Sequence, residues 1–173
     1  MSEDVQKAIL VRFEETDLVA LLRSSLAPLI DQAKEQQIEL RVESLGDVPK
    51  LPVDPEKLAW GVATLVGNAL RYVRRGNSVR AGGSVLVHVE HDEDTKDIAI
   101  AVQDDGPGIP EEKLPYLFER RNGAPHAEGL ALSLVRDIVA AHGGRIDVVC
   151  GANSDEAHER GTSITLRLPR IRA

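Results

Sequence analysis

The sequence predicts an α+β two-layer sandwich, in which three main helices cover one face of a mixed, mostly antiparallel sheet of about five strands. Stretches with apolar residues at helical spacing are interspersed with shorter stretches in which apolar and polar residues alternate. The later strands come in two consecutive pairs joined by polar loops, which is typical of antiparallel pairing. No repeat or low-complexity tract interrupts this order, so the helices and strands are expected to share one core.

Three helices are expected, each with a boundary signal. Thr16 or Asp17 can cap the first helix. Asp54 can cap the second, with Pro55 at its first helical position. Gly143 closes the third. Their expected ranges are residues 18–37, 54–75 and 128–141.

Five strands are expected between and after these helices. A glycine-rich loop, residues 76–83, precedes a hairpin whose two strands are joined by a charged turn. A second strand pair surrounds a polar loop near the end of the chain. The expected strand ranges are residues 38–42, 85–89, 97–104, 145–150 and 162–168.

The composition favours one soluble domain of cytosolic character. The 173 residues are 42% hydrophobic, but only 3% are aromatic, so an aliphatic core is expected. No segment approaches the roughly 20 apolar residues of a membrane span, and the acidic start has no signal-peptide hydrophobic region. Cys150 is the single cysteine, which rules out an internal disulfide. The net charge of −7 argues against nucleic acid as a partner.

The stretch DDGPGIP, residues 104–110, is the strongest local signal of a binding site. The preceding alternation brings Asp104 to the end of a strand, and flexible backbone follows at once. Gly106 and Gly108 lack a Cβ, so the chain can turn sharply and lie against a flat ring. A plain surface turn is the alternative, and the pattern alone does not decide between them.

The second helix carries a polar stripe that suits a metal-bound phosphate chain. Thr64, Asn68, Arg71 and Arg75 recur at spacings of three and four, so they share a face. An Asn amide offers a neutral oxygen to Mg²⁺, and an Arg guanidinium forks onto phosphate. The alternative for the arginines is a solvated basic helix end, which the helix dipole also favours.

Several motifs in order resemble the ATP-binding domain of sensor histidine kinases, in the GHKL superfamily, which has the Bergerat fold. LVGNALRY, residues 65–72, resembles the N box, and DDGPGIP resembles the G1 box. LPYLFER, residues 114–120, resembles the F box, and EGLALSLV, residues 128–135, resembles a G2 box with fewer glycines than usual. The similarity continues through HGGRI at residues 142–146 and the strand after Gly161, and spans roughly residues 17–169.

This resemblance implies a site for ATP and Mg²⁺ on particular residues of this chain. Asp104 is expected to accept a hydrogen bond from the adenine amino group, beside Thr162. Asn68 is expected to hold Mg²⁺, and Arg71 to position the phosphates. The remaining expected ATP contacts are Tyr72 against the base (with ordinary core packing as its alternative), Gly106, Gly108, Ile109, Leu117, Arg120, Gly129 and Leu130.

The resemblance also implies that the nucleophile is a histidine outside this chain. In the family it lies on a preceding dimerisation and phosphoacceptor domain, from which a response regulator receiver domain takes the phosphate. We therefore expect residues 1–16 to be a connecting segment and residues 17–173 the catalytic domain. The domain is expected to be a monomer alone and a dimer in the full-length protein, whose membrane anchoring stays open. The chain's own histidines are expected at surface or capping positions.

Three functions remain open at this stage. ATP-hydrolysing relatives carry a glutamate four residues before the metal-binding asparagine, where this chain has Thr64, so slow hydrolysis and a kinase are favoured. Ala127 and Ala131 stand where the family usually has glycine, and the lid between Phe118 and Gly129 is short. A degenerate regulatory nucleotide-binding domain is therefore the second hypothesis. A protein-serine kinase of anti-sigma-factor type is the third.

Overall fold

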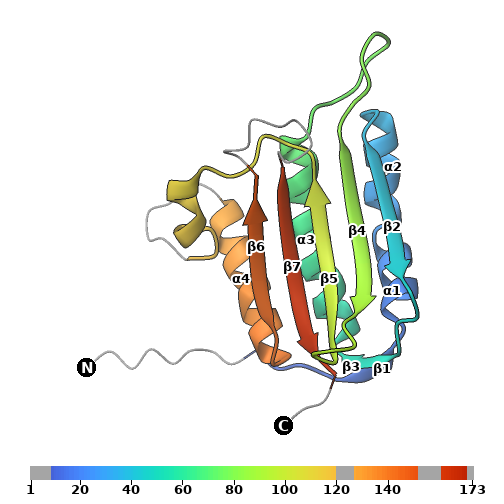
Figure 1. Cartoon of the computed structure of the whole chain (residues 1–173), viewed down its shortest axis with the longest axis vertical. Coiled ribbons are helices and arrows are strands. Elements are labelled where there is room, and N and C mark those ends of the chain that lie inside the picture. Colours follow the sequence, from blue (N-terminus) through green and yellow to red (C-terminus); the bar gives the residue numbers. More distant parts are fainter. Residues whose placement is uncertain (1–8, 120–126, 152–160, 171–173) are drawn as a thin grey trace.

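A five-stranded sheet forms one layer of the molecule in the computed structural model, which describes residues 9–119, 127–151 and 161–170 (Figure 1). Its strand order is β2-β4-β5-β7-β6, with β2 and β4 parallel and every other neighbouring pair antiparallel. The prediction of a mixed, mostly antiparallel sheet of five strands is confirmed. The strands are β2 (Glu39–Leu45), β4 (Ser84–His91), β5 (Asp97–Asp104), β6 (Arg145–Cys150) and β7 (Thr162–Pro169).

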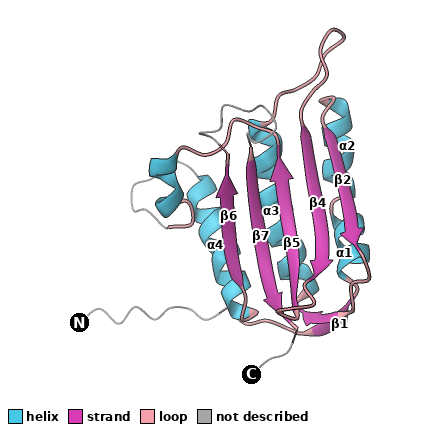
Figure 2. Cartoon of the chain, in the orientation of Figure 1, coloured by secondary structure: helices cyan, strands magenta, loops and turns pink. Residues whose placement is uncertain are grey.

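The α-helices form the second layer and all lie on one face of this sheet (Figure 2). They are α1 (Leu18–Ser25), α2 (Ala27–Glu35), α3 (Pro55–Tyr72) and α4 (Ala127–Ala141), and a short 3₁₀ helix, η1 (Glu111–Tyr116), precedes α4. Within the described ranges, no helix has the length and apolar character needed to cross a membrane.

The expectation of one helix over residues 18–37 is wrong, because the helix is interrupted at Leu26. Pro28 has no N–H to donate to the carbonyl of Ser24, and its ring crowds the preceding turn. Leu26 still donates to the Leu22 carbonyl at 2.9 Å, so α1 and α2 follow each other directly as two helical segments that meet at Leu26. The second segment ends at Glu35, and Gln37 has a positive φ of 56°.

The second expected helix ends three residues earlier than the sequence predicts. Val73 is extended, with ψ of 149°, and its side chain is buried in the core. Burial of Val73 turns the chain away from the helix axis, so Arg75 does not continue the polar stripe of α3. The prediction that Arg75 shares a helical face with Asn68 and Arg71 is therefore wrong.

An aliphatic core lies between the two layers. The inward faces of the strands are lined by Val85, Val87, Ile98, Ile100 and Leu166, all 1% exposed or less. Leucines and valines from α1, α3 and α4 pack against them. Burial of such side chains contributes about 1.5–3 kcal/mol each, which explains how a chain with few aromatic residues holds two layers together.

A small two-stranded sheet closes one end of the molecule. Strands β1 (Glu14–Thr16) and β3 (Leu51–Val53) pair antiparallel. The sequence did not indicate either strand, because three residues are too few for an alternation pattern. Strand β1 falls within the expected connecting segment, whose role in linking to another domain stays a prediction.

Asp54 and His142 fasten this end to the helices. The Asp54 carboxylate accepts the N–H groups of Arg12 and Lys57 at 2.9 and 3.1 Å. The Asp54 N–H donates to Nε2 of His142 at 3.0 Å, and the His142 ring meets Phe13 edge to face. His142 is thus a buried residue that satisfies the start of α3. Among the other histidines, His88 and His91 are half-buried strand residues, and His126 and His158 lie outside the described ranges.

Candidate functional site

Asp104 ends β5 at a partly enclosed position beside the end of α3. Its Oδ1 accepts the N–H of Gly106 at 2.9 Å, and the backbone N–H of Thr162 also donates to the carboxylate. Burial raises the pKa of Asp104, these two hydrogen bonds oppose that effect, and the neighbouring Asp105 charge adds to it. The residue is therefore a sheltered acceptor that pays a desolvation cost for its position.

Asp105 has a different role from Asp104. Its two carboxylate oxygens accept the N–H of Ser84 at 2.9 Å and the Ser84 hydroxyl at 3.3 Å. Its own N–H donates to the Ser84 carbonyl at 3.3 Å. Asp105 thus fastens the turn to the start of β4, whereas the Asp104 carboxylate is sheltered at the end of β5.

Glycines allow this turn to approach its surroundings closely. A Cβ on Gly106 would lie 3.0 Å from Oδ1 of Asp104 and 3.4 Å from the carbonyl oxygen of Tyr72. Gly108 has a φ of +82°, a backbone conformation that residues other than glycine adopt only with strain. Gly161, which the sequence indicates only as the residue before the last strand, has a φ of +122°, and a Cβ there would collide with the Asp104 carbonyl. The backbone around Asp104 is therefore shaped by glycine on both sides.

The end of α3 presents the polar stripe next to this turn. Asn68 is half-buried and Arg71 is exposed, and both lie in the last five residues of the helix. A Cβ on Gly67, the residue before Asn68, would meet nothing within 4 Å. Thr64, one turn earlier, donates its hydroxyl to the Trp60 carbonyl at 2.9 Å and offers no carboxylate to activate water.

Tyr72 is the last residue of α3 and stands in solvent rather than in the core. Its side chain is 58% exposed, which rules out the alternative of ordinary core packing. The backbone carbonyl of Tyr72 lies near Gly106, so the aromatic ring starts from a point adjacent to the Asp104 turn. An exposed ring at this place is available to stack on a flat base.

Ile109, Leu117 and Thr162 border the same region. The Ile109 N–H donates to Sγ of Cys150 at 2.9 Å, and the thiol donates to the Ile109 carbonyl at 3.2 Å. Leu117 is half-buried against the core after η1. Thr162 is 8% exposed and lies opposite both Asp104 and Cys150 in the strand register. The structure therefore brings the expected adenine-side residues to one end of the sheet.

Part of the expected phosphate side lies outside the described residues. This is true of Arg120, Arg121 and His126. Gly129 and Leu130 belong to the first turn of α4. Within the ranges that the structure describes, no group of three His, Cys, Asp or Glu residues is placed to hold a metal ion.

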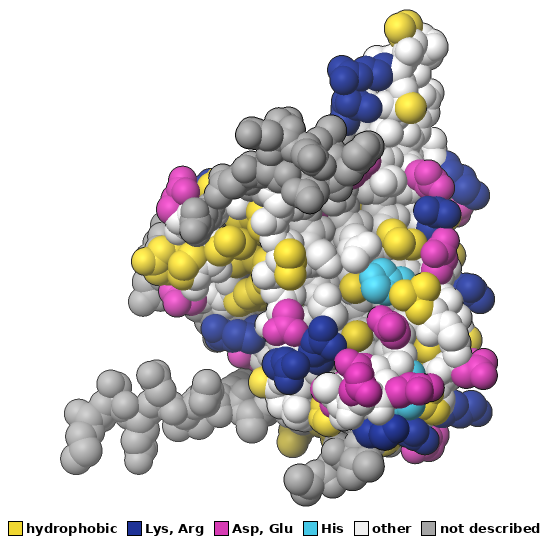
Figure 3. Space-filling view, viewed as in Figure 1, with side chains coloured by type: hydrophobic (Ala, Val, Ile, Leu, Met, Phe, Trp, Pro, Cys, Tyr) yellow, Lys and Arg dark blue, Asp and Glu magenta, His cyan; other side chains and the backbone are white. Residues whose placement is uncertain are grey.

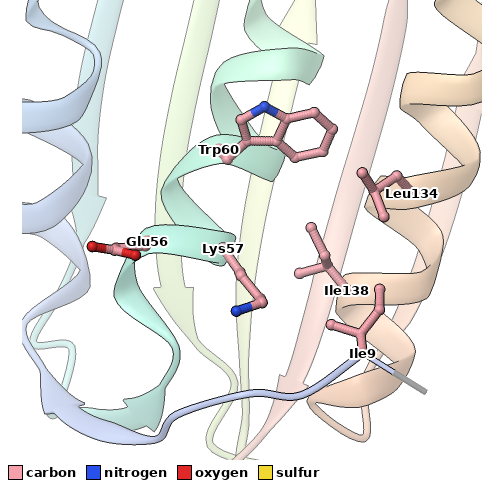
Figure 4. A pocket seen from close by; sticks show the side chains of 6 residues that line it. All are labelled: Ile9, Glu56, Lys57, Trp60, Leu134 and Ile138. Atoms are coloured by element: carbon pink, nitrogen blue, oxygen red, sulfur yellow. The ribbon is translucent and has the colours of Figure 1, made fainter. Parts of the chain in front are cut away.

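A separate apolar hollow of about 310 Å³ lies between α3 and α4 (Figure 4). It is lined by Ile9, Glu56, Lys57, Trp60, Leu134 and Ile138. Trp60 precedes Asn68 by eight residues, which is roughly 12 Å along a helix. The hollow contains none of the residues that the sequence predicts for the site, so it is distinct from the region around Asp104.

Comparisons with known proteins identify a family and several relatives of this chain. Residues 53–172 match the family described as histidine kinase-, DNA gyrase B-, and HSP90-like ATPase. The chain is 31% identical over 141 residues to the adaptive-response sensory kinase SasA of Synechococcus sp. (strain JA-3-3Ab), covering 79% of this chain and 36% of SasA. It is 37% identical over 123 residues to the signal transduction histidine-protein kinase AfsQ2 of Streptomyces coelicolor, covering 68% of this chain and 20% of AfsQ2.

A solved structure shows the same fold. Full-length ShkA, crystallised in complex with AMPPNP, superposes with a TM-score of 0.77 at 23% identity, covering 96% of this chain and 33% of ShkA. The chain spans about a third or less of the length of these proteins. Because the family match covers well over half of the chain, and relatives named as sensor kinases share its sequence, the chain belongs to the histidine kinase-, DNA gyrase B-, and HSP90-like ATPase family, as a histidine kinase type of ATP-binding domain.

Proposed function

We propose that this chain is the catalytic domain of a two-component sensor histidine kinase. It binds Mg²⁺-ATP and presents the γ-phosphate to a histidine on a separate phosphoacceptor domain. The family match and the relatives named as sensor kinases support this proposal. The observation that carries it is the contrast between the two adjacent acids: Asp105 is exposed and held by Ser84, whereas Asp104 is sheltered beside the end of α3 and its pKa is raised by burial.

On the base side, Asp104 accepts a hydrogen bond from the adenine amino group. Guanine presents a carbonyl acceptor at that position, so a carboxylate there disfavours it. Thr162 holds the carboxylate through its backbone N–H. Tyr72 covers the base with its exposed ring, and Gly106, Gly108, Ile109 and Leu117 form the surrounding wall.

On the phosphate side, Asn68 and Arg71 are the described residues that fit. Mg²⁺ takes one or two protein ligands and fills the rest of its shell with water and phosphate oxygens. The half-buried amide of Asn68 suits such a shared ion. When bound, Mg²⁺-ATP supplies the phosphoryl group and neutralises its charge. Arg71 orients the phosphates, and Arg120, Gly129 and Leu130 complete the expected contacts.

Thr64 favours transfer of the γ-phosphate to a protein over hydrolysis of ATP. A glutamate at that place on α3 would act as a general base for water, and Thr64 instead donates its hydroxyl within the helix. The γ-phosphate is therefore expected to persist until an imidazole reaches it. The partners that this implies are a dimerisation and phosphoacceptor domain and, through it, a response regulator receiver domain. We expect the domain to work in the cytoplasm, as a monomer alone and as a dimer in a full-length protein.

Nucleotide titration followed by phosphotransfer tests this proposal. We expect ATP to bind with a micromolar dissociation constant, about −8 kcal/mol, only when Mg²⁺ is present. Mixing the domain with radiolabelled ATP and candidate phosphoacceptor domains should then label a histidine, which is recognised by its acid-labile phosphate. Label on a partner's serine would instead indicate the anti-sigma-factor type of kinase.

The second candidate is a regulatory domain that binds nucleotide but transfers phosphate poorly. The observation in its favour is that α4 begins at Ala127, so Ala127 and Ala131 both lie at the start of the helix where the family's glycines are expected. Weak ATP binding that Mg²⁺ does not strengthen would favour this candidate.

A further inference from the structure

The loop between α3 and β4 projects beyond the end of the sheet (Figure 1). We call residues 73–83 the arginine loop. At its base, the Gly83 N–H donates to the Arg74 carbonyl at 2.7 Å, and the Gly76 N–H donates to the Gln36 carbonyl after α2 at 3.0 Å. At its tip, Oδ1 of Asn77 accepts two backbone N–H groups, from Val79 and Arg80, both at 2.9 Å. The loop therefore has a defined shape.

Charge is strongly segregated around this loop. From residue 57 to residue 89 the chain has five basic residues and no acidic one, although the whole chain carries −7. Arg74, Arg75 and Arg80 belong to the loop and are exposed. Figure 3 shows basic side chains on the projection, while basic and acidic side chains are mixed over the lower part of this face. The loop is thus a local positive patch on an acidic protein.

In the part of the chain that the structure describes, two of these guanidinium groups have no acidic partner. Arg74 donates from Nη2 to the Ala81 carbonyl at 2.8 Å and so stabilises the loop. Among the described residues, no ion pair joins Arg75 or Arg80 to a carboxylate. The nearby carboxylate of Asp105 is already bound to Ser84. Arg75 and Arg80 therefore present their charge to an external partner.

The shape of the loop indicates the kind of partner. Guanidinium groups bind carboxylates and phosphates in a forked geometry. A long duplex or a flat anionic membrane would also face the acidic body and be repelled by it. A small acidic patch on a protein can contact the projecting loop alone. Salt then screens the patch from acidic residues of the body that lie more than about 8 Å away. We propose that the arginine loop is a docking surface for an acidic protein partner, whose carboxylates pair with Arg75 and Arg80.

The position of the loop places such a partner beside the candidate site. The loop follows Tyr72 directly, and a Cβ on Gly83 would lie 2.6 Å from Oδ1 of Asp105. The 93% exposed side chain of Val79 adds a small apolar contact at the tip. Charge complementarity of this kind mainly accelerates encounter and fixes orientation. A partner docked there is therefore oriented toward the end of the sheet where Asp104 lies.

A charge-reversal experiment with an acidic peptide tests the proposal. A fluorescent, acetylated glutamate-rich peptide is titrated with the chain, and anisotropy is measured at low and physiological salt. The test variant is R75E/R80E, and the matched control is R23E/K34E, which reverses two exposed charges on α1 and α2. We expect binding that weakens with salt, that falls at least about tenfold in R75E/R80E, and that stays unchanged in the control.

Two outcomes would overturn the proposal. One is peptide binding that does not distinguish R75E/R80E from the control. The other is a wild-type chain that binds short duplex DNA or phosphatidylserine vesicles more tightly than the peptide, with the same dependence on the loop. Circular dichroism melting shows that each variant is folded, and R75Q/R80Q repeats the measurement without introducing new acids.

Discussion

Thr162 donates its backbone N–H to the carboxylate of Asp104, its partner across β5 and β7. The acid is thereby held at the end of the sheet by a hydrogen bond that does not depend on any side chain. A substitution at position 104 should therefore change what the site recognises more than how it is built.

Asp104→Asn should remove the preference for adenine. The amide can still accept from Gly106 and Thr162, but it also offers a donor to the guanine carbonyl. We expect ATP affinity to fall about tenfold to hundredfold and the ratio of ATP to GTP affinity to approach one, measured by calorimetry. Asp105→Asn removes the neighbouring charge and alters the Ser84 contact but keeps the Asp104 carboxylate, so it is the matched control and should keep the ratio high. An unchanged ratio in Asp104→Asn would refute the assigned role.

The contribution of Asp104 to folding stability should depend on pH. Burial raises the pKa of Asp104, so the folded protein binds its proton more readily than the unfolded chain does. The ionised acid therefore costs folding stability above the ordinary Asp pKa, and this cost disappears as pH falls. We expect Asp104→Asn to melt at or above the wild-type temperature at pH 7, with the difference shrinking in acid.

Lowering the pH should weaken ATP binding, although it removes the stability cost of ionised Asp104. The ionised carboxylate is a stronger acceptor for the adenine amino group than the protonated acid is, so affinity should decrease as pH falls through the raised pKa of Asp104. Measuring wild type and Asp104→Asn in parallel separates this effect from the titration of the phosphates. If the two proteins lose affinity equally on acidification, Asp104 is not the group that titrates.

Cys150 is expected to position the wall of the adenine site. Its thiol is bound to both backbone groups of Ile109, on the far side of the turn from Asp104. Cys150→Ala removes both contacts and should weaken ATP binding about fivefold, near 1 kcal/mol. Cys150→Ser retains a donor and an acceptor and should lose less. Equal affinities in the two variants would mean that the contact does not matter for binding.

Most of the fold and the position of Asp104 in the candidate site could be predicted from the sequence, because both depend on local patterns. Alternation predicted β5 and hence the position of Asp104, and the cap at Asp54 predicted the start of α3. The leucine spacing predicts one helix over residues 18–37, whereas Pro28 accounts for the break at Leu26 in the structure. Contacts between distant positions left no local signal. The pairing of Cys150 with Ile109, 41 residues away, and the approach of Gly161 to Asp104 depend on the folded sheet.

Asp54 should stabilise the protein in a pH-dependent way. Burial opposes its ionisation, but hydrogen bonds from Arg12 and Lys57 and the charge of Lys57 prevail and lower the pKa of Asp54 to about 2. A lowered pKa means that its stabilisation is present above the ordinary Asp pKa of 3.8 and is lost as pH falls toward about 2. Asp54→Ala should cost about 2 kcal/mol at pH 7, measured by urea unfolding.

The comparison with Asp54→Asn separates the charge from the cap. The amide keeps an acceptor for the Lys57 N–H, so a smaller loss is expected at neutral pH. The gap between wild type and Asp54→Ala should close as pH is lowered from about 4 to about 2. A gap that stays constant over this range would show that the carboxylate charge does not contribute.

The two alanines at the start of α4 are expected to limit nucleotide affinity. Glycine at positions 127 and 131 would remove a methyl group where the family's backbone approaches phosphate, at a cost of about 1 kcal/mol of helix stability each. Ala127→Gly combined with Ala131→Gly should tighten Mg²⁺-ATP binding severalfold while lowering the melting temperature. Ala140→Gly, at an exposed position near the other end of α4, is the control that lowers stability alone. If the double variant binds ATP no better than this control, the methyl groups do not obstruct the phosphates, and the second candidate function loses its support.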